Sequence, residues 1–207
     1  MPTLYRCRTS LREVADLFQA EPPPHAEWEA ELWPKRTGLV VVDRGAGRRI
    51  EPMRWGVPPS PIDFSNPGKR PPTSLWFGTL WMNKDELLGP AHRCLVIADS
   101  FALPDGPEGA RTRTWYGFDD RPVFAWAGVW RQAKAGAGYA GLMVDAADPV
   151  SPNRAMPAIL DGEEEYGLWL SADPAAASRV AMRSPPRPDM YREPTEQPWG
   201  ADRTPGP

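Results

Sequence analysis

Proline limits the folding of this chain more than any other residue, because it occupies 27 of the 207 positions. A proline lacks the backbone N–H that helices and sheets use, so it is excluded from helix interiors and from central strands. The chain must therefore turn often, and we expect short strands and short helices joined by irregular segments. A chain of this length can still bury a sizeable core as one domain.

Short hydrophobic segments between the prolines predict the regular elements. Ser10 and Glu13 form a capping box before an amphipathic helix over residues 11–19. Strands are expected over residues 39–42, 49–55, 95–98, 139–145 and 158–160, a hairpin from residues 111–116 and 123–127 around Asp119 and Asp120, and a second short helix over residues 163–170. Many strands and few helices indicate a β-rich α+β domain.

The expected domain covers residues 1–183, with a proline-rich loop over residues 58–72. Residues 184–207 are rich in proline, arginine and glycine and offer little to bury. Such a composition predicts a flexible C-terminal tail.

Charge and cysteine content narrow the class of protein. The net charge of −3 argues against a strongly basic nucleic-acid-binding protein, although local patches rather than totals decide such binding. Cys7 and Cys94 give no disulfide framework, and the sequence shows neither a signal peptide nor an apolar run long enough to cross a membrane. We expect a soluble, cytoplasmic monomer whose ten tryptophans lie mostly in the core.

The sequence gives no spacing typical of a metal or cofactor site. His25 and His92 are isolated, and no set of acidic residues has the spacing of metal ligands; the acids considered are Asp43, Glu51, Asp63 and Asp99. The glycines at positions 45 and 47 lack the helix and lysine of a phosphate-binding loop. We therefore expect no metal and no cofactor.

Four blocks of sequence carry a resemblance to a known family. In chain order they are MRWGVP over residues 53–58, HRCLV over 92–96, FAWAGVW over 124–130 and AMPAIL over 155–160. Together they resemble the SRAP domain, the SOS-response-associated peptidase family, over roughly residues 1–170. The resemblance implies a barrel-like fold of mostly antiparallel strands with a few short helices.

The resemblance also implies a function, because the family captures abasic sites in single-stranded DNA covalently as part of the DNA-damage response. In the family, loss of the initiator methionine exposes a cysteine at position two. Its thiol and α-amine condense with the sugar aldehyde to form a thiazolidine. An asparagine, a glutamate and a histidine assist, while arginines and a tryptophan hold the DNA strand.

This chain departs from the family at the positions that carry the chemistry. Pro2 stands at the place of the nucleophilic cysteine, Ser74 near the asparagine, Leu103 at the glutamate and Asn153 at the histidine. Trp76 falls near a DNA-binding arginine of the family. Four such losses predict that the family's own condensation is lost or altered.

Two residues are candidates to replace the missing thiol. Cys7 lies an odd number of residues from position two, so in a strand it faces the other side, and it lacks the free α-amine. We therefore interpret Cys7, like Cys94, as a buried small hydrophobic residue. Pro2, once methionine is removed, has a secondary amine that can form a Schiff base with an aldehyde.

DNA binding can persist without this chemistry, since phosphate contacts need only correctly placed positive charge. The DNA-binding candidates are Lys35, Arg36, Arg54, Arg113 and Arg154, with Trp55 and Trp76 as stacking residues. Further cations stand at positions 48, 49, 69, 70 and 111. A solvated surface and a core role for the tryptophans remain the alternative interpretation.

Three hypotheses follow. The first is a divergent SRAP domain that binds single-stranded or abasic DNA, nucleoid-associated if that binding is kept. The second is an enzyme that uses Pro2 as an imine-forming amine and cleaves the strand as a lyase. The third is a non-catalytic protein-interaction module in which Trp76 and Leu103 fill the former site.

Overall fold

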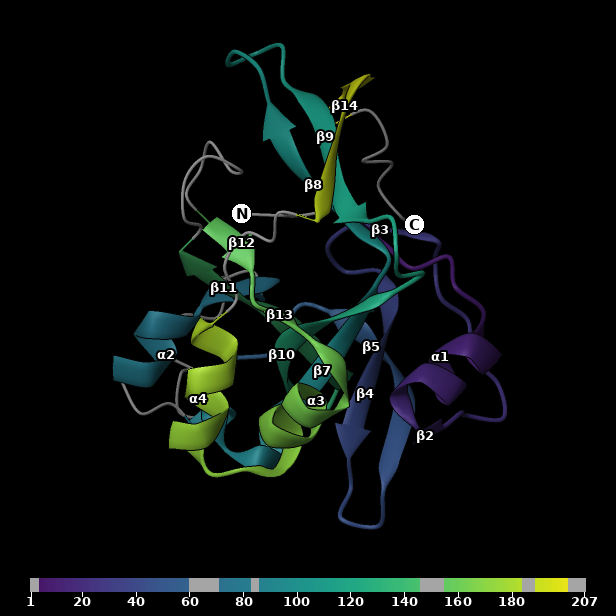
Figure 1. Ribbon diagram of the computed structural model, residues 1–207, viewed down its shortest axis with the longest axis vertical. Helices are drawn as coiled ribbons and strands as arrows, with labels where there is room; N and C mark the ends of the chain where they lie inside the picture. The colour runs from purple at the N-terminus through teal and green to yellow at the C-terminus, as the bar shows by residue number, and fades with distance from the viewer. Residues whose placement is uncertain (1–3, 60–70, 83–85, 146–154, 184–188, 201–207) are drawn as a thin grey trace.

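The structure is a computed structural model that describes residues 4–59, 71–82, 86–145, 155–183 and 189–200 (Figure 1). In chain order its elements are β1 (Tyr5–Arg6), α1 (Leu11–Phe18), β2 (Ala20–Glu21), β3 (Glu31–Leu32), β4 (Thr37–Asp43), β5 (Arg48–Trp55), β6 (Ser74–Trp76), α2 (Phe77–Met82), β7 (Arg93–Ala98), β8 (Ser100–Asp105), β9 (Thr112–Phe118), β10 (Phe124–Ala133), β11 (Gly136–Asp145), β12 (Ala155–Pro157), β13 (Ile159–Leu160), α3 (Gly162–Ser171), α4 (Pro174–Met182) and β14 (Met190–Pro198). Two short 3-10 turns, Glu86–Leu88 and Pro90–His92, lead into β7.

Five strands close into a barrel at the centre of the molecule. The order is β5, β4, β7, β10 and β11, with antiparallel neighbours throughout that series. The barrel closes where β11 pairs with β5 in parallel, with Gly138 opposite Arg54 and Tyr139 opposite Trp55. Closure leaves these strands without a free edge, which protects them from pairing with other chains.

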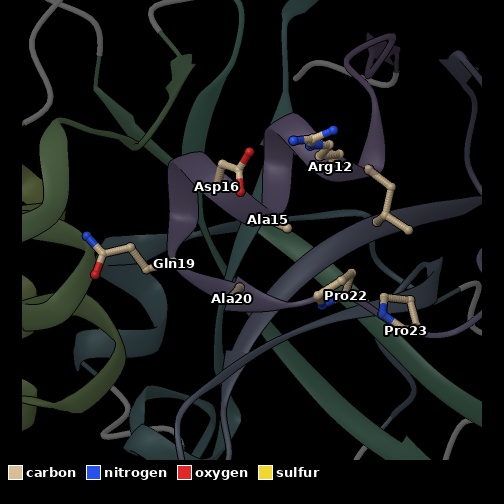
Figure 2. A pocket seen from close by; sticks show the side chains of 8 residues that line it. Arg12, Ala15, Asp16, Gln19, Ala20, Pro22 and Pro23 are labelled. Atoms are coloured by element: carbon tan, nitrogen blue, oxygen red, sulfur yellow. The ribbon is translucent and has the colours of Figure 1, made fainter.

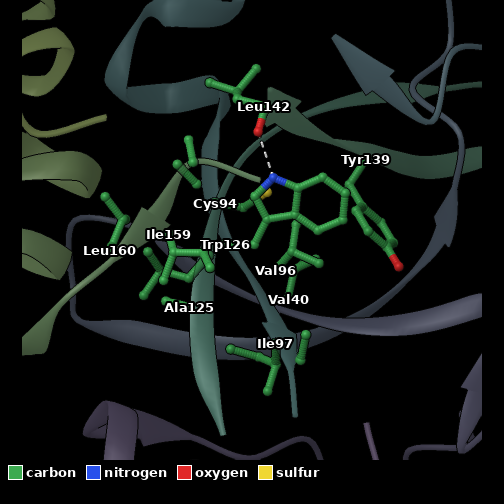
Figure 3. Close-up of a cluster of buried hydrophobic side chains, with 14 of the residues drawn as sticks. Val40, Cys94, Val96, Ile97, Ala125, Trp126, Tyr139, Leu142, Ile159 and Leu160 are labelled. Atoms are coloured by element: carbon green, nitrogen blue, oxygen red, sulfur yellow. Dashed lines mark hydrogen bonds between the residues drawn. The ribbon is translucent and has the colours of Figure 1, made fainter. Parts of the chain in front are cut away.

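Aromatic side chains fill the core, and glycines make room for them. The indole N–H of Trp126 donates to the Leu142 carbonyl at 2.6 Å (Figure 3). A Cβ at Gly141 would lie 2.1 Å from the ring of Trp126, so this strand position has space only for glycine. Tyr5 packs edge-on against Trp55 with ring centroids 4.9 Å apart, and its hydroxyl is hydrogen-bonded to that of Tyr139.

A second sheet of order β14, β9, β8, β1 and β3 rises from the barrel, at the top of Figure 1. It is continuous with the barrel because β7 runs into β8 through Asp99 alone. The Asp99 carboxylate accepts hydrogen bonds from the Arg8 backbone at 2.8 Å and from the Ser100 hydroxyl at 2.7 Å. These bonds fix the end of β1 beside the bend.

The helices lie on the outside of the barrel. Helix α1 begins with the predicted capping box, in which Ser10 and Glu13 bond each other's backbone N–H. Helix α3 packs against the barrel through Trp169, whose indole N–H donates to the Cys94 carbonyl at 2.9 Å. Helix α4 begins at Pro174, where the Asp173 side chain caps two backbone N–H groups.

The structure confirms a β-rich α+β fold with a barrel core and short helices. The predicted hairpin is wrong. Strand β9 pairs with β8 and β14 in one sheet, whereas β10 pairs with β7 and β11 in the other, so the turn at Asp119 and Asp120 crosses between sheets. Local sequence shows that a turn occurs but does not determine which strands pair across it.

The expected flexible tail also needs correction for the part that the structure describes. Residues 190–198 form β14, which pairs antiparallel with β9 from Met190 opposite Phe118 to Pro198 opposite Thr112. None of its side chains is fully buried, and for that reason its composition is like that of a tail. Residues 184–188 and 201–207, and most of the predicted loop over 58–72, lie outside the described residues.

Candidate nucleic-acid interface

A tight turn carries two of the predicted DNA-binding cations. The Arg36 N–H donates to the Trp33 carbonyl at 3.1 Å and closes a four-residue turn with Pro34 and Lys35 at its centre. Lys35 has a φ of 76°. Proline at the second position and a positive φ at the third are typical of a type II turn, where the third residue is usually glycine.

Hydrogen bonds clamp this turn onto the end of β5. The Lys35 N–H donates to the Trp55 carbonyl at 2.8 Å, and the Trp55 N–H donates to the Arg36 carbonyl at 2.8 Å. The Arg54 Nε donates to the Lys35 carbonyl at 3.2 Å. The turn is therefore rigidly attached to the barrel, although it is far from β5 in sequence.

The clamp brings three cations to one edge of the barrel. Lys35 and Arg54 are exposed, and Arg36 is half-buried with its guanidinium 3.4 Å from the Glu29 carboxylate. An exposed ion pair of this length is weak, so Arg36 keeps much of its positive potential. We call Lys35, Arg36 and Arg54 together the basic edge.

Two predicted DNA-binding residues lie inside the protein instead. Trp55 has 0% exposure, and its indole N–H donates to the Thr73 carbonyl at 2.9 Å. Arg113 is 2% exposed, and its guanidinium lies 2.9 Å from the Glu31 carboxylate. Neither side chain faces solvent, so the predictions of base stacking by Trp55 and phosphate binding by Arg113 are corrected.

Of the positions predicted to correspond to the family's catalytic residues, two lie in the described part of the chain. Leu103 is 1% exposed in the main core, and Ser74 is 7% exposed on β6 beside Gly141 of β11. Trp76, two residues on, is half-buried and packs against the same core. Pro2, Asn153 and Arg154 lie outside the described residues, as do the cations at positions 69 and 70.

Two other predicted DNA-binding cations form ion pairs within the protein. Arg48 lies 2.6 Å from the Glu163 carboxylate, and Arg49 lies 3.1 Å from that of Glu21. Arg111, by contrast, is exposed and lies immediately before β9.

Both cysteines are buried, as the sequence analysis expected. Burial, with a smaller contribution from the Asp99 charge, raises the pKa of the Cys7 thiol to about 12. Burial likewise raises the pKa of Cys94 well above its usual value. Both thiols are protonated at neutral pH, and a protonated thiol is a poor nucleophile.

Within the described ranges, no cluster of three His, Cys, Asp or Glu side chains is arranged to hold a metal ion. Nor does any helix in those ranges combine the length and apolar character needed to cross a membrane.

Two surface hollows among the described residues are not lined by the basic edge. One of about 700 Å³ runs along α1 and is lined by Arg12, Asp16 and Gln19 together with apolar residues such as Pro22 and Pro23 (Figure 2). A second, of about 620 Å³, lies between α2 and α4, lined by Trp81, Met82, Leu88, Gly89, Asp173, Pro174 and Ala175. Neither contains a basic cluster for phosphate or an evident nucleophile.

Sequence reasoning missed the residue that opens the basic turn. Trp33 is not among the candidates that the sequence singles out, yet it is 8% exposed and forms a small buried cluster with Leu4, Ala102 and Trp115. The signal was present in the dipeptide Trp33-Pro34 followed by two cations, because proline favours the second position of a turn.

Comparison with known proteins gives one family and several relatives. Residues 1–196 match the family described as SOS response associated peptidase (SRAP). The abasic site processing protein HMCES of Pongo abelii is 30% identical over 59% of this chain and 45% of its own length. The protein of the same name from Mus musculus is 29% identical over the same shares. The chain thus spans about half the length of these curated relatives.

Solved structures have the same fold at lower identity. A protein of Bordetella bronchiseptica aligns with a TM-score of 0.74 and 22% identity over 93% of this chain and 99% of that one. A protein of Bacteroides thetaiotaomicron aligns with a TM-score of 0.74 and 13% identity, over 93% of this chain and 91% of that one. Because the family match covers nearly the whole sequence, this chain belongs to the SRAP family.

Proposed function

We propose that this chain binds single-stranded DNA at abasic sites and acts in the processing of that damage. Membership of the SRAP family supports this, as do two relatives named abasic site processing proteins. The observation that carries the proposal is the basic edge, where backbone hydrogen bonds and one from the Arg54 side chain hold Lys35, Arg36 and Arg54 together from two distant segments. A fixed row of cations is what a phosphate backbone requires.

We further infer that the family's thiol-based condensation is lost or altered in this chain. Leu103 offers no proton and is enclosed in the core, where it replaces the family's glutamate. Ser74 and Asn153 stand in place of the asparagine and the histidine, and Pro2 has no thiol. Cys7 is no substitute, because its pKa of about 12 keeps it protonated.

Binding to an abasic single-stranded oligonucleotide tests the proposal. Fluorescence anisotropy would compare the wild type with the double variant Lys35→Glu/Arg54→Glu. A matched double variant, Arg12→Glu/Arg179→Glu, makes the same charge change at exposed positions on α1 and α4. We expect the first variant to bind at least about tenfold more weakly and the second to bind almost as the wild type does. Equal losses would indicate a general charge effect and contradict the assignment.

The same oligonucleotide tests the chemistry. After incubation, a denaturing gel would show a heat-stable adduct if condensation occurs, and borohydride would trap an imine. We expect no heat-stable adduct that depends on Cys7. A borohydride-dependent adduct abolished by Pro2→Ala would favour the amine-based enzyme, in which the secondary amine adds to the aldehyde and water leaves to give an iminium ion. Absence of both binding and adduct would favour the protein-interaction hypothesis.

A further inference from the structure

A second cluster of aromatic side chains lies apart from the main core, on the sheet formed by β14, β9, β8, β1 and β3. Trp33 and Trp115 form it together with Leu4 and Ala102, and Tyr191 and Trp199 pack against it. Trp33 follows β3 directly, and Trp115 lies on β9 opposite Ala102 of β8. We call this set the tryptophan cluster.

Guanidinium groups lie over both indole rings. The guanidinium carbon of Arg6 is 3.5 Å from the centre of the Trp115 ring, and that of Arg113 is 5.3 Å from the centre of the Trp33 ring. Glu31 holds both arginines, at 3.1 Å from Arg6 and 2.9 Å from Arg113. Indole rings interleaved with cations are the composition on which proteins stack the bases of single-stranded nucleic acid.

The tryptophan cluster contains a buried donor that is not satisfied. The indole nitrogen of Trp115, a residue only 1% exposed, has no hydrogen-bond partner among the described residues. Buried polar atoms are nearly always paired, so an unpaired one needs an explanation. A ligand with acceptor atoms, such as a nucleobase, would supply the missing partner.

Trp199 lies on Trp33 at the end of β14. Its ring centre is 6.0 Å from that of Trp33 at an interplanar angle of 68°, and its backbone N–H donates to the Arg111 carbonyl at 2.9 Å. The strand before it has no buried side chain, contains Pro194 and Pro198, and has an irregular register between them. A strand of this kind is weakly held at its end, because prolines donate no ladder hydrogen bonds.

The tryptophan cluster and the basic edge are contiguous. Trp33 is the first residue of the turn that carries Lys35 and Arg36, and its carbonyl accepts the Arg36 N–H at 3.1 Å. A strand of DNA whose phosphates follow the basic edge therefore has its bases within reach of the Trp33 ring. Phosphate contacts and base stacking would then come from one turn.

We propose that Trp33 is a base-stacking residue and that, when DNA is absent, the Trp199 ring occupies the position of the stacked base. Single-stranded DNA displaces Trp199 and the end of β14, and a base then stacks on Trp33. This inference rests on the proposed DNA-binding function. The exchange is feasible because base-on-indole stacking is generally at least as favourable as the edge-to-face pair that it replaces.

Removal of the competing ring tests the exchange. The probe is an oligothymidine without an abasic site, and its affinity for the full chain is measured at fixed low salt. We expect Trp199→Ala to bind roughly two- to tenfold more tightly than the wild type, since the ring pair no longer has to be broken. The control is Trp81→Ala, which removes an exposed tryptophan on α2, outside the tryptophan cluster. This variant should leave the affinity unchanged.

Loss of the stacking residue should have the opposite effect. We expect Trp33→Ala to weaken binding about fivefold or more, and the double variant Trp33→Ala/Trp199→Ala to bind as weakly as Trp33→Ala alone. If Trp33→Ala does not fold, Trp33→Phe keeps an aromatic ring and should retain most of the affinity. Exchange of the β14 amide protons should also speed up when the oligonucleotide is bound to the wild type.

The outcomes separate this inference from the proposed function. If the wild type binds in a salt-dependent manner but Trp199→Ala binds no more tightly, the exchange is overturned and the proposed function stands. Slower amide exchange in β14 on binding would overturn it as well. If neither the wild type nor Trp199→Ala binds thymidine or abasic oligonucleotides, both proposals fail.

Discussion

Lys35 holds a backbone conformation that side chains other than glycine rarely adopt. Its φ of 76° lies in the left-handed region, which costs a residue with a Cβ about 1–2 kcal/mol. The hydrogen bonds of its N–H to Trp55 and of its carbonyl to Arg54 hold it there. Strained residues gather at functional sites, and here the strain coincides with a cation of the basic edge.

Replacing Lys35 by glycine should separate stability from binding. Glycine relieves the strain but loses more conformational freedom on folding, so we expect Lys35→Gly to be more stable by about 0.5–1 kcal/mol, or unchanged. Because the variant loses a cation, its affinity for single-stranded DNA should fall several-fold. Urea unfolding measures the stability, and fluorescence anisotropy measures the affinity for DNA. Undiminished binding by Lys35→Gly would show that this lysine is not at the interface.

The buried thiol of Cys7 makes stability depend on pH in a defined window. Its pKa is about 12 in the folded protein against 9.0 for an ordinary cysteine, so the unfolded chain loses the proton first as pH rises. The stabilisation is fully present below pH 9 and decreases between pH 9 and 12. We expect the difference in free energy of unfolding between the wild type and Cys7→Ala to decrease from pH 8 to pH 11. A constant difference would contradict the assigned burial.

The sequence identified the cations that form the basic edge, but it did not show which of the other candidate residues are buried. Lys35, Arg36 and Arg54 meet on one edge as DNA-binding candidates, whereas Trp55 and Arg113 are buried. Burial of Arg113 depends on Glu31, a residue 82 positions away, and no local pattern shows that pairing. The packing of Trp33 likewise depends on a distant residue, Trp199.

At the scale of the elements, the barrel depends on strand positions where only glycine fits. A Cβ at Gly141 of β11 would meet the ring of Trp126 on β10 at 2.1 Å, and both residues are enclosed by neighbouring strands. The ring cannot move away without breaking its hydrogen bond to Leu142. Packing across this pair of strands therefore determines which residue each position accepts.

Substitution of this glycine should destabilise the barrel strongly. We expect Gly141→Ala to lose about 2–3 kcal/mol or more of unfolding free energy, the usual cost of overpacking a closed core. Gly167→Ala is the matched control, because its Cβ would meet no atom closer than 3.6 Å and it lies inside α3. Alanine favours a helix, so the control should be unchanged or slightly more stable. Thermal unfolding of both variants measures the effect. A melting temperature of Gly141→Ala equal to that of the wild type would contradict this packing.

Elements set by local sequence were predicted well, and their pairing was not. Helix α1 follows from its capping box and apolar spacing, and β4, β7 and β11 follow from runs of apolar residues. The chain direction after β9 could not be read locally, because a turn residue does not encode whether the next strand stays in the same sheet. Strand β14 escaped prediction because its stability comes from β9 rather than from its own side chains.

At the scale of the whole molecule, a chain of net charge −3 presents a local basic edge. The barrel positions that edge by closing β5 against β11, while the second sheet places the tryptophan cluster beside it. We therefore propose that DNA binding resides on a rigid row of cations and does not require the family's condensation chemistry.

The salt dependence of binding tests this claim most directly. Each phosphate contact on a single strand contributes about 0.7 to the slope of log affinity against log salt concentration. The slope would be measured with an abasic oligonucleotide for the wild type and for Lys35→Ala/Arg36→Ala/Arg54→Ala. We expect a steep negative slope for the wild type that becomes shallower by roughly 2 in the triple variant. The same slope for both proteins, or no salt dependence in the wild type, would contradict it.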